Sequence, residues 1–146
     1  MTPVPVGHIR HVAICIFRDR NRILVAPGYD DVKNERFFRP LGGAVEFGEA
    51  AEEALRREIR EELGLEILDV VRLGVVENRF EYRGQPGHEI VFVFNASFVD
   101  ASVYSVPTLP IREPGWDGPA EWLVLSDSLP APLYPAGLQD LLRRAI

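Results

Sequence analysis

The sequence has little of what an exported or membrane-embedded protein needs. It contains one cysteine, Cys15, so no disulfide can form within the chain, and this is typical of a reducing compartment. No apolar run reaches the roughly 18 residues of a membrane-spanning helix. The N-terminal stretch MTPVPVGHIR lacks the apolar core of a secretory signal. We therefore expect a cytoplasmic protein with no membrane partner, in which Cys15 is a small core residue.

Positive charge is also scarce. The chain has 16 lysine and arginine residues against 22 aspartate and glutamate residues, which gives a net charge of −6. An acidic chain without a basic run is poorly suited to binding the nucleic-acid backbone, so we expect no nucleic-acid partner. Phosphorylated small molecules stay compatible with this charge, because a bound metal ion supplies local positive charge.

The sequence does have enough apolar residues for a core. They make up 47% of its 146 residues, which excludes a disordered chain. This length suits one domain, and no repeat or linker divides it, so residues 1–146 are expected to form a single domain. Runs of apolar and β-branched residues predict strands over residues 8–17, 22–26, 36–41, 66–76, 89–99 and 121–125, and residues 44–47 are expected to form a short extended stretch.

Glycine and proline residues set the expected boundaries. Pro27-Gly28 is expected to end the second strand, residues 78–87 to form a turn region, and residues 100–120 to form a long loop. Helices are predicted over residues 49–63 and 135–146. This order of elements lacks the regular βαβ alternation of a doubly wound sheet.

The first predicted helix carries most of the chemistry. Its Glu58, Glu61 and Glu62 stand at spacings of three and four, so at about 100° per residue they share one arc of the helix surface. Like charges at an i,i+4 spacing destabilise a helix by roughly 0.2–0.5 kcal/mol. A divalent cation removes this repulsion, and an all-oxygen ligand set is what Mg²⁺ or Mn²⁺ takes. The neighbouring stripe is apolar and is expected to face a core: Leu55, Ile59 and Leu63.

The stretch from Gly43 to Leu65 resembles the Nudix box, the signature of the Nudix hydrolase family. The box reads G-x5-E-x7-R-E-U-x-E-E-x-G-U, in which U is a bulky aliphatic residue. Every constrained position is matched, by Gly43, Glu49, Arg57, Glu58, Ile59, Glu61, Glu62, Gly64 and Leu65. A solvated acidic helix is the alternative, but it would not require Arg57 or the two glycines at these positions.

This resemblance implies both a fold and an activity. The fold would be α/β (α+β): the Nudix fold, a mixed β-sheet in an α/β/α sandwich. The activity would be hydrolysis of a small-molecule nucleoside diphosphate linked to another moiety, X. Mg²⁺ (or Mn²⁺) would bind phosphate oxygens and lower the pKa of a bound water. Members of the family are frequently homodimers.

The resemblance also assigns roles within the box. Glu61 and Glu62 would hold the metal, Glu58 would ligate it or act as the base, and the backbone carbonyl of Gly42 or Gly43 would reach it. Arg57 would orient a glutamate through a charge-assisted hydrogen bond, unless it is only an exposed helix charge.

Outside the box, the candidates rest on position and residue type. Glu89 opens the strongest predicted strand and would complete the metal shell or take the proton from water; otherwise it is a polar strand end. Phe38 would stack on a base, and Arg39 and Arg79 would contact phosphates, although core or surface roles suit them equally. Tyr82 lies 17 residues beyond Leu65, where similar diadenosine polyphosphate hydrolases carry a tyrosine; packing is the alternative. Other aromatic and basic residues expected near the cleft are Phe37, Phe80, Arg36 and Arg83.

Proteins with two other functions share this fold. A non-catalytic nucleotide sensor usually lacks a glutamate of the box, and this box is intact. An isomerase of prenyl diphosphates needs a catalytic cysteine, whereas Cys15 lies in a predicted strand well before the box. The long loop that contains Trp116 is expected to cover the site, because such loops in a compact domain are often functional.

Overall fold

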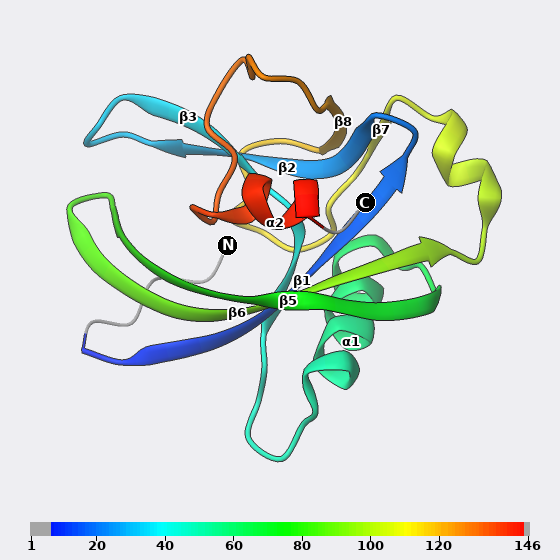
Figure 1. The fold of residues 1–146 in the computed structure, drawn as a ribbon, viewed down its shortest axis with the longest axis horizontal. Coiled ribbons are helices and arrows are strands. Elements are labelled where there is room, and N and C mark those ends of the chain that lie inside the picture. Colours follow the sequence, from blue (N-terminus) through cyan, green and yellow to red (C-terminus); the bar gives the residue numbers. More distant parts are fainter. Residues whose placement is uncertain (1–6, 145–146) are drawn as a thin grey trace.

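The structure, a computed structural model that describes residues 7–144, is built on a mixed sheet with two α-helices (Figure 1). Strands hydrogen-bond in the order β5-β6-β1-β2-β8-β7, with β3 on β2 and β4 on β1. Among the strand pairs of the described residues, β1 with β6 is parallel and the others are antiparallel. The elements are β1 (Ile9–Asp19), β2 (Arg22–Asp30), β3 (Glu35–Arg39), β4 (Leu41–Ala44), α1 (Ala51–Leu63), β5 (Ile67–Tyr82), β6 (Gln85–Phe98), η1 (Ala101–Ser105), β7 (Thr108–Leu109), β8 (Ala120–Val124) and α2 (Leu138–Arg144).

Strand β1 contributes to two hydrophobic cores, because alternate side chains of a strand point to opposite faces. Cys15 and its alternate neighbours pack in the core under α1, and Ile14 and its alternate neighbours pack in the core under α2. In Figure 1, α2 lies above β1 and β5, and α1 lies below them. The predicted burial of this strand on both faces and the core position of Cys15 are therefore confirmed. The mixed sheet with its helices agrees with the predicted fold class.

The prediction of a turn region over residues 78–87 is wrong. β5 continues to Tyr82 and β6 begins at Gln85, so the turn consists of Arg83 and Gly84 alone. These two residues have φ angles of 51° and 77°. Two consecutive positive φ angles form a tight hairpin turn whose twist matches that of the paired strands. The glycines and the proline that predicted a loop lie mostly within the ladder.

Several other boundaries differ from prediction. Pro27 and Gly28 lie inside β2 rather than ending it, because the pairing with β3 continues to Asp30. Pro40 separates β3 from β4, where one strand was predicted. α1 and α2 begin later than predicted, and the predicted loop over residues 100–120 contains η1 and β7. Residues 145–146 of the second predicted helix lie outside the described residues.

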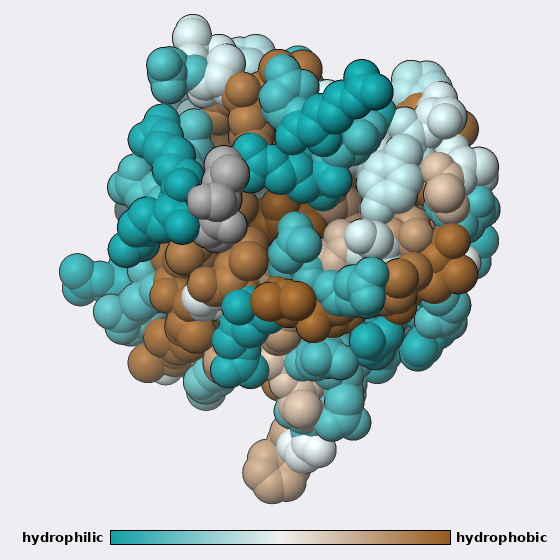
Figure 2. All heavy atoms as spheres, turned by 45° about the vertical axis from the view of Figure 1, so that its right-hand side comes forward, coloured by the Kyte–Doolittle hydropathy of each residue, from teal (hydrophilic) through white to brown (hydrophobic). Residues whose placement is uncertain are grey.

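Part of the molecular surface is apolar. Figure 2 shows one face, on which hydrophobic side chains gather across the middle and lower left while hydrophilic ones cover the upper part. Strand β5 is an edge strand of the sheet and carries the exposed Val71 and Val75.

Within residues 7–144, no helix has the length and apolar character to cross a bilayer.

Candidate active site

Helix α1 buries an apolar stripe together with Glu62 and leaves Glu61 exposed. Its start is supported by Glu53, whose Oε1 accepts a hydrogen bond from the Ala50 N–H at 3.1 Å. Its end is Gly64, which has a left-handed φ of 68° and donates its N–H to the Arg60 carbonyl. Glycine is favoured there because it has no Cβ to clash. The predicted apolar stripe is buried: Leu55, Ile59 and Leu63.

The Arg57 guanidinium links the box glutamates. Nε and Nη2 donate to Glu49 Oε2 and Oε1 at 2.8 and 3.0 Å. Nη1 donates to Glu58 Oε1 at 2.9 Å and to Glu61 Oε2 at 3.3 Å. Nη2 also donates to the Ala44 carbonyl at 2.9 Å. The hydrogen bonds from Arg57 lower the pKa of Glu49 to about 2. Arg57 is therefore not a solvated helix charge, because it donates hydrogen bonds to two of the predicted metal ligands, Glu58 and Glu61.

Glu58 lies directly over Gly43, which belongs to strand β4 and pairs with β1. A Cβ on Gly43 would overlap Glu58 Cδ and would lie 2.7 Å from Oε1. Any other residue at this position would push the carboxylate away, so Gly43 leaves the room that Glu58 occupies. Burial raises the pKa of Glu58, and the hydrogen bond from Arg57 opposes that rise.

Glu62 is a fully buried carboxyl group, with 0% of its surface exposed. Within the described part of the chain, neither of its oxygens makes a hydrogen bond of ordinary geometry. Burial raises the pKa of Glu62 to about 9, and the charge of Glu58 adds to this rise. The Arg39 charge and the nearby Gly42 N–H act in the opposite direction. A buried carboxyl group with unsatisfied oxygens is unfavourable without a cation or a proton.

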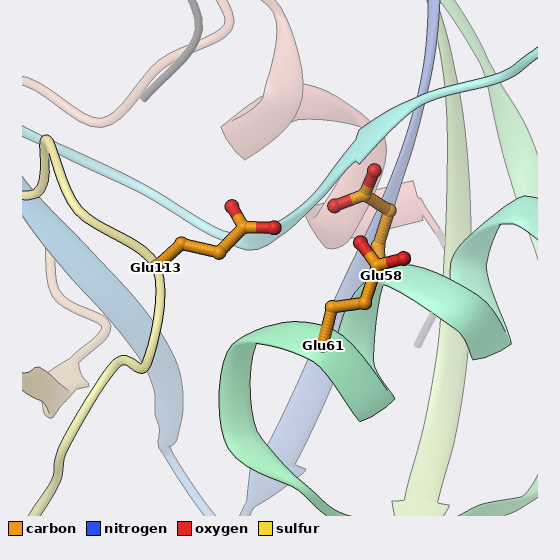
Figure 3. A group of neighbouring side chains, drawn as sticks. All are labelled: Glu58, Glu61 and Glu113. Atoms are coloured by element: carbon orange, nitrogen blue, oxygen red, sulfur yellow. The ribbon is translucent and has the colours of Figure 1, made fainter.

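Glu113 joins this group from outside the box, and the sequence analysis missed it. The backbone N–H of Arg112 donates to the Glu62 carbonyl at 2.8 Å, and the Arg112 guanidinium lies against Gly64. These contacts dock the loop on the end of α1 and bring Glu113 beside Glu58 and Glu61 (Figure 3). The loop was expected to cover the site through Trp116, but the residue that it brings to the glutamates is Glu113.

The donor set fits a hard divalent cation. Glu58, Glu61 and Glu113 each offer one oxygen, and these atoms lie within 4.8 Å of one another. Three carboxylates so close together repel one another unless a cation or protons neutralise them. All the donors are oxygens, as Mg²⁺ and Mn²⁺ prefer. These three residues, together with the orphaned oxygens of Glu62, could hold such an ion.

Glu89 lies apart from this carboxylate cluster, on β6. It is 2% exposed, and its Oε2 is 3.7 Å from Nη1 of Arg10 on the neighbouring strand β1. The pKa of the Arg10 guanidinium is lowered by burial and is influenced by the charges of Glu89, Arg39 and Glu58. Arg10 therefore interacts both with Glu89 and, more weakly, with the charge of Glu58 in the cluster.

A cavity of about 160 Å³, here called the aromatic cavity, opens between the β2–β3 and β5–β6 hairpins. Three predicted substrate-binding residues line it: Arg39, Arg79 and Tyr82. Glu89 lines it as well. Its full lining is Asp30, Lys33, Glu35, Phe37, Arg39, Asn78, Arg79, Phe80, Glu81, Tyr82, Glu89, Tyr134, Pro135 and Ala136.

The expected role of Phe38 needs correction. Phe38 is 5% exposed and packs in the core under α2, whereas its neighbour Phe37 lines the aromatic cavity. Successive side chains of a strand point to opposite faces, so only one of two adjacent phenylalanines can face the cavity.

Comparison with known proteins agrees with this geometry. The model of the NUDIX domain matches residues 7–137, which is most of the chain. The chain belongs to the Nudix hydrolase family. As a Nudix protein, it is a hydrolase that acts on phosphoric anhydride bonds.

Solved structures of Nudix proteins are similar to this one over most of its length. A MutT NUDIX hydrolase from Burkholderia pseudomallei is 26% identical, with a TM-score of 0.67 over 93% of this chain and 98% of its own. The ORF135 protein of E. coli is 24% identical, with a TM-score of 0.56 over 94% of this chain and 91% of its own. A NUDIX hydrolase from Nitrosomonas europaea is 19% identical, with a TM-score of 0.57 over 79% and 72%. The last two support the fold alone.

Proposed function

We propose that this Nudix protein is a metal-dependent pyrophosphohydrolase that cleaves the diphosphate bond of a nucleoside diphosphate linked to X. The observation that carries the proposal is the cluster of Glu58, Glu61 and Glu113, whose oxygens lie within 4.8 Å of one another and suit a divalent cation. Arg39 lines the aromatic cavity, and its charge also acts on the buried Glu62. A substrate with its base in the cavity would therefore present its phosphates to the carboxylate cluster.

The carboxylate cluster supplies the metal site in this proposal. Glu58, Glu61 and Glu113 would hold Mg²⁺ or Mn²⁺, with Glu62 beside them. The ion would neutralise phosphate charge and lower the pKa of a water molecule. Arg57 keeps Glu58 and Glu61 in place through its hydrogen bonds, so it acts through these carboxylates rather than on the substrate.

Residues of the cavity and of the cluster would bind phosphate and move the proton. Arg39 is the phosphate-binding candidate, because guanidinium groups bind phosphate oxygens in pairs. Glu89 is a candidate base, since it is buried, borders the cavity and is held by Arg10. Glu58 is the other candidate, because it belongs to the cluster itself.

The aromatic cavity supports a nucleotide as substrate. Phe37, Phe80, Tyr82 and Tyr134 give it aromatic walls, and every nucleobase has a π-face that stacks on such rings. The Tyr82 ring meets Phe37 edge-on at 5.9 Å, so it forms part of a wall. Nucleotide and dinucleotide polyphosphates, including diadenosine polyphosphates, fit this description.

A substrate panel tests the proposal. It contains diadenosine polyphosphates, ADP-ribose, NADH, nucleotide sugars, and normal and oxidised nucleoside triphosphates, each with Mg²⁺ or Mn²⁺ or with a chelator. We expect metal-dependent release of a nucleoside monophosphate or diphosphate, which E61Q and E62Q lose. The matched control is E66Q, because Glu66 is exposed and pairs with Arg60 away from the cluster. Binding of metal and nucleotide without any turnover would replace this proposal with a nucleotide sensor.

A further inference from the structure

Two phenylalanine rings of the aromatic cavity lie over glycines of neighbouring strands. Phe37 on β3 is the register partner of Gly28 on β2. A Cβ built on Gly28 would overlap Cζ and Cε2 of Phe37, so the ring covers the space that a side chain would fill. Gly28 is buried by this contact.

The second pair repeats this arrangement on the other hairpin. Phe80 on β5 is the register partner of Gly87 on β6. A Cβ built on Gly87 would overlap Cζ and Cε2 of Phe80, and Gly87 is also buried. Both rings line the cavity, so each glycine lets one wall lie closer to its strand than any other residue would allow.

The two hairpins are also fastened together at their tips. Asp30, at the end of β2, accepts a hydrogen bond at Oδ2 from the Arg83 N–H of the other hairpin at 3.0 Å. Its Oδ1 accepts from the Val32 and Lys33 N–H groups of its own hairpin at 3.0 and 3.1 Å. Lys33 Nζ donates to the Glu81 carbonyl at 2.9 Å. The two hydrogen bonds between the hairpins therefore oppose a widening of the cavity.

We propose that Gly28 and Gly87 are specificity-determining positions, which set the width of the aromatic cavity so that it admits one flat heteroaromatic ring. The inference rests on the proposed function and assigns its selectivity to these two positions. A nucleobase meets the requirement because it is planar and stacks on aromatic side chains. A hexose or another non-planar moiety does not, so the nucleoside base occupies the cavity and X lies beyond the phosphates.

Alanine at either glycine tests the proposal. Neither glycine has a positive φ, so alanine fits the backbone and its methyl group acts only on the ring, which moves into the cavity. The matched control is G74A, because a Cβ on Gly74 of β5 would lie 2.9 Å from Leu141 Cδ1 of α2, away from the cavity. If G28A or G87A fails to fold, F80L takes its place, since it removes the stacking surface and adds no bulk to the strand.

Two measured quantities would stay unchanged if the glycines had only a structural role. The first is the dissociation constant for AMP, GMP, CMP and UMP by calorimetry. The second is kcat/KM for the four nucleoside triphosphates divided by kcat/KM for inorganic tripolyphosphate, which has no base. Base stacking predicts about a tenfold weakening of monophosphate binding, and a similar fall of the ratio, in G28A and G87A but not in G74A.

The outcomes separate this inference from the proposed function. If the wild type hydrolyses no nucleotide but binds a monophosphate that G28A and G87A bind more weakly, the inference holds and the proposed hydrolysis fails. If the wild type hydrolyses nucleotides and the folded variants keep the ratio and the dissociation constants, the inference is overturned and the hydrolysis stands. Absence of monophosphate binding in the wild type also overturns the inference.

Discussion

Arg57 donates two parallel hydrogen bonds to the Glu49 carboxylate, from Nε to Oε2 at 2.8 Å and from Nη2 to Oε1 at 3.0 Å. Its third nitrogen, Nη1, is then directed at Glu58 and Glu61. Such a fork needs the planar guanidinium, since the ammonium group of lysine is a single point charge. The bond to Glu49, a residue of the loop before α1, therefore fixes the direction in which Arg57 holds the glutamates of the cluster.

We predict that R57K lowers kcat/KM by about 10- to 100-fold, as is usual when a residue that orients metal ligands is replaced. The matched control is R56K, since Arg56 pairs with Glu52 on an exposed part of the same helix. Steady-state kinetics and thermal unfolding of both variants are the measurements. Equal losses of activity in R56K and R57K would contradict the orienting role.

The Arg57–Glu49 ion pair should make the stability of the folded protein depend on pH. Arg57 lowers the pKa of Glu49 from 4.5 to about 2, so the unfolded chain takes up this proton at a higher pH than the folded protein does. The stabilisation is complete above about pH 4.5 and is lost as the pH falls towards 2. Between these values the Tm of the metal-free wild type should fall more steeply than that of E49Q. Parallel curves for the two proteins would show that the pair has no such effect.

The buried carboxyl group of Glu62 should make stability depend on pH in the opposite direction. Its pKa is raised from 4.5 to about 9, so the metal-free protein loses stability relative to E62Q as the pH rises through this interval. Removing the uncompensated group should stabilise the metal-free protein at neutral pH by roughly 1–3 kcal/mol. Thermal unfolding with and without Mg²⁺ checks this, since E62Q should also lose most of the stabilisation that the metal gives. A metal-free E62Q that is less stable than the wild type at pH 7 would refute the prediction.

Glu113 should matter for metal affinity although it lies outside the Nudix box. We predict that E113Q weakens Mn²⁺ binding by about tenfold or more and changes Tm little in the absence of metal. Calorimetric titration with Mn²⁺ measures this, with E66Q as the control. Unchanged Mn²⁺ affinity in E113Q would mean that Glu113 does not bind the ion, although it lies close to Glu58 and Glu61.

The box and its helix could be predicted from the sequence because local rules determine them. Helical spacing groups Glu58, Glu61 and Glu62, and the apolar stripe decides which side is buried. Gly64 ends the helix through its own backbone preference. The strand alternation around Cys15 likewise predicted a strand buried on both faces. None of these features depends on distant parts of the chain.

The rest depends on contacts between distant segments. Glu113 reaches the cluster because Arg112 docks on the end of α1, and no local pattern predicts this contact. Gly87 was assigned to a turn, whereas the ring of Phe80 across the ladder takes the place of its missing side chain. The choice between Phe37 and Phe38 depends on strand register, because a shift of one residue exchanges the two faces.

Metal-dependent catalysis by the box glutamates is tested most directly by the initial rate of nucleotide hydrolysis as Mg²⁺ is titrated into the wild type, E61Q and E66Q, with the best substrate of the panel. We predict no rate without metal, a saturable rise with Mg²⁺ in the wild type and in E66Q, and a rate near background in E61Q at every Mg²⁺ concentration. Hydrolysis that needs no metal, or an E61Q titration that matches that of E66Q, would contradict this prediction.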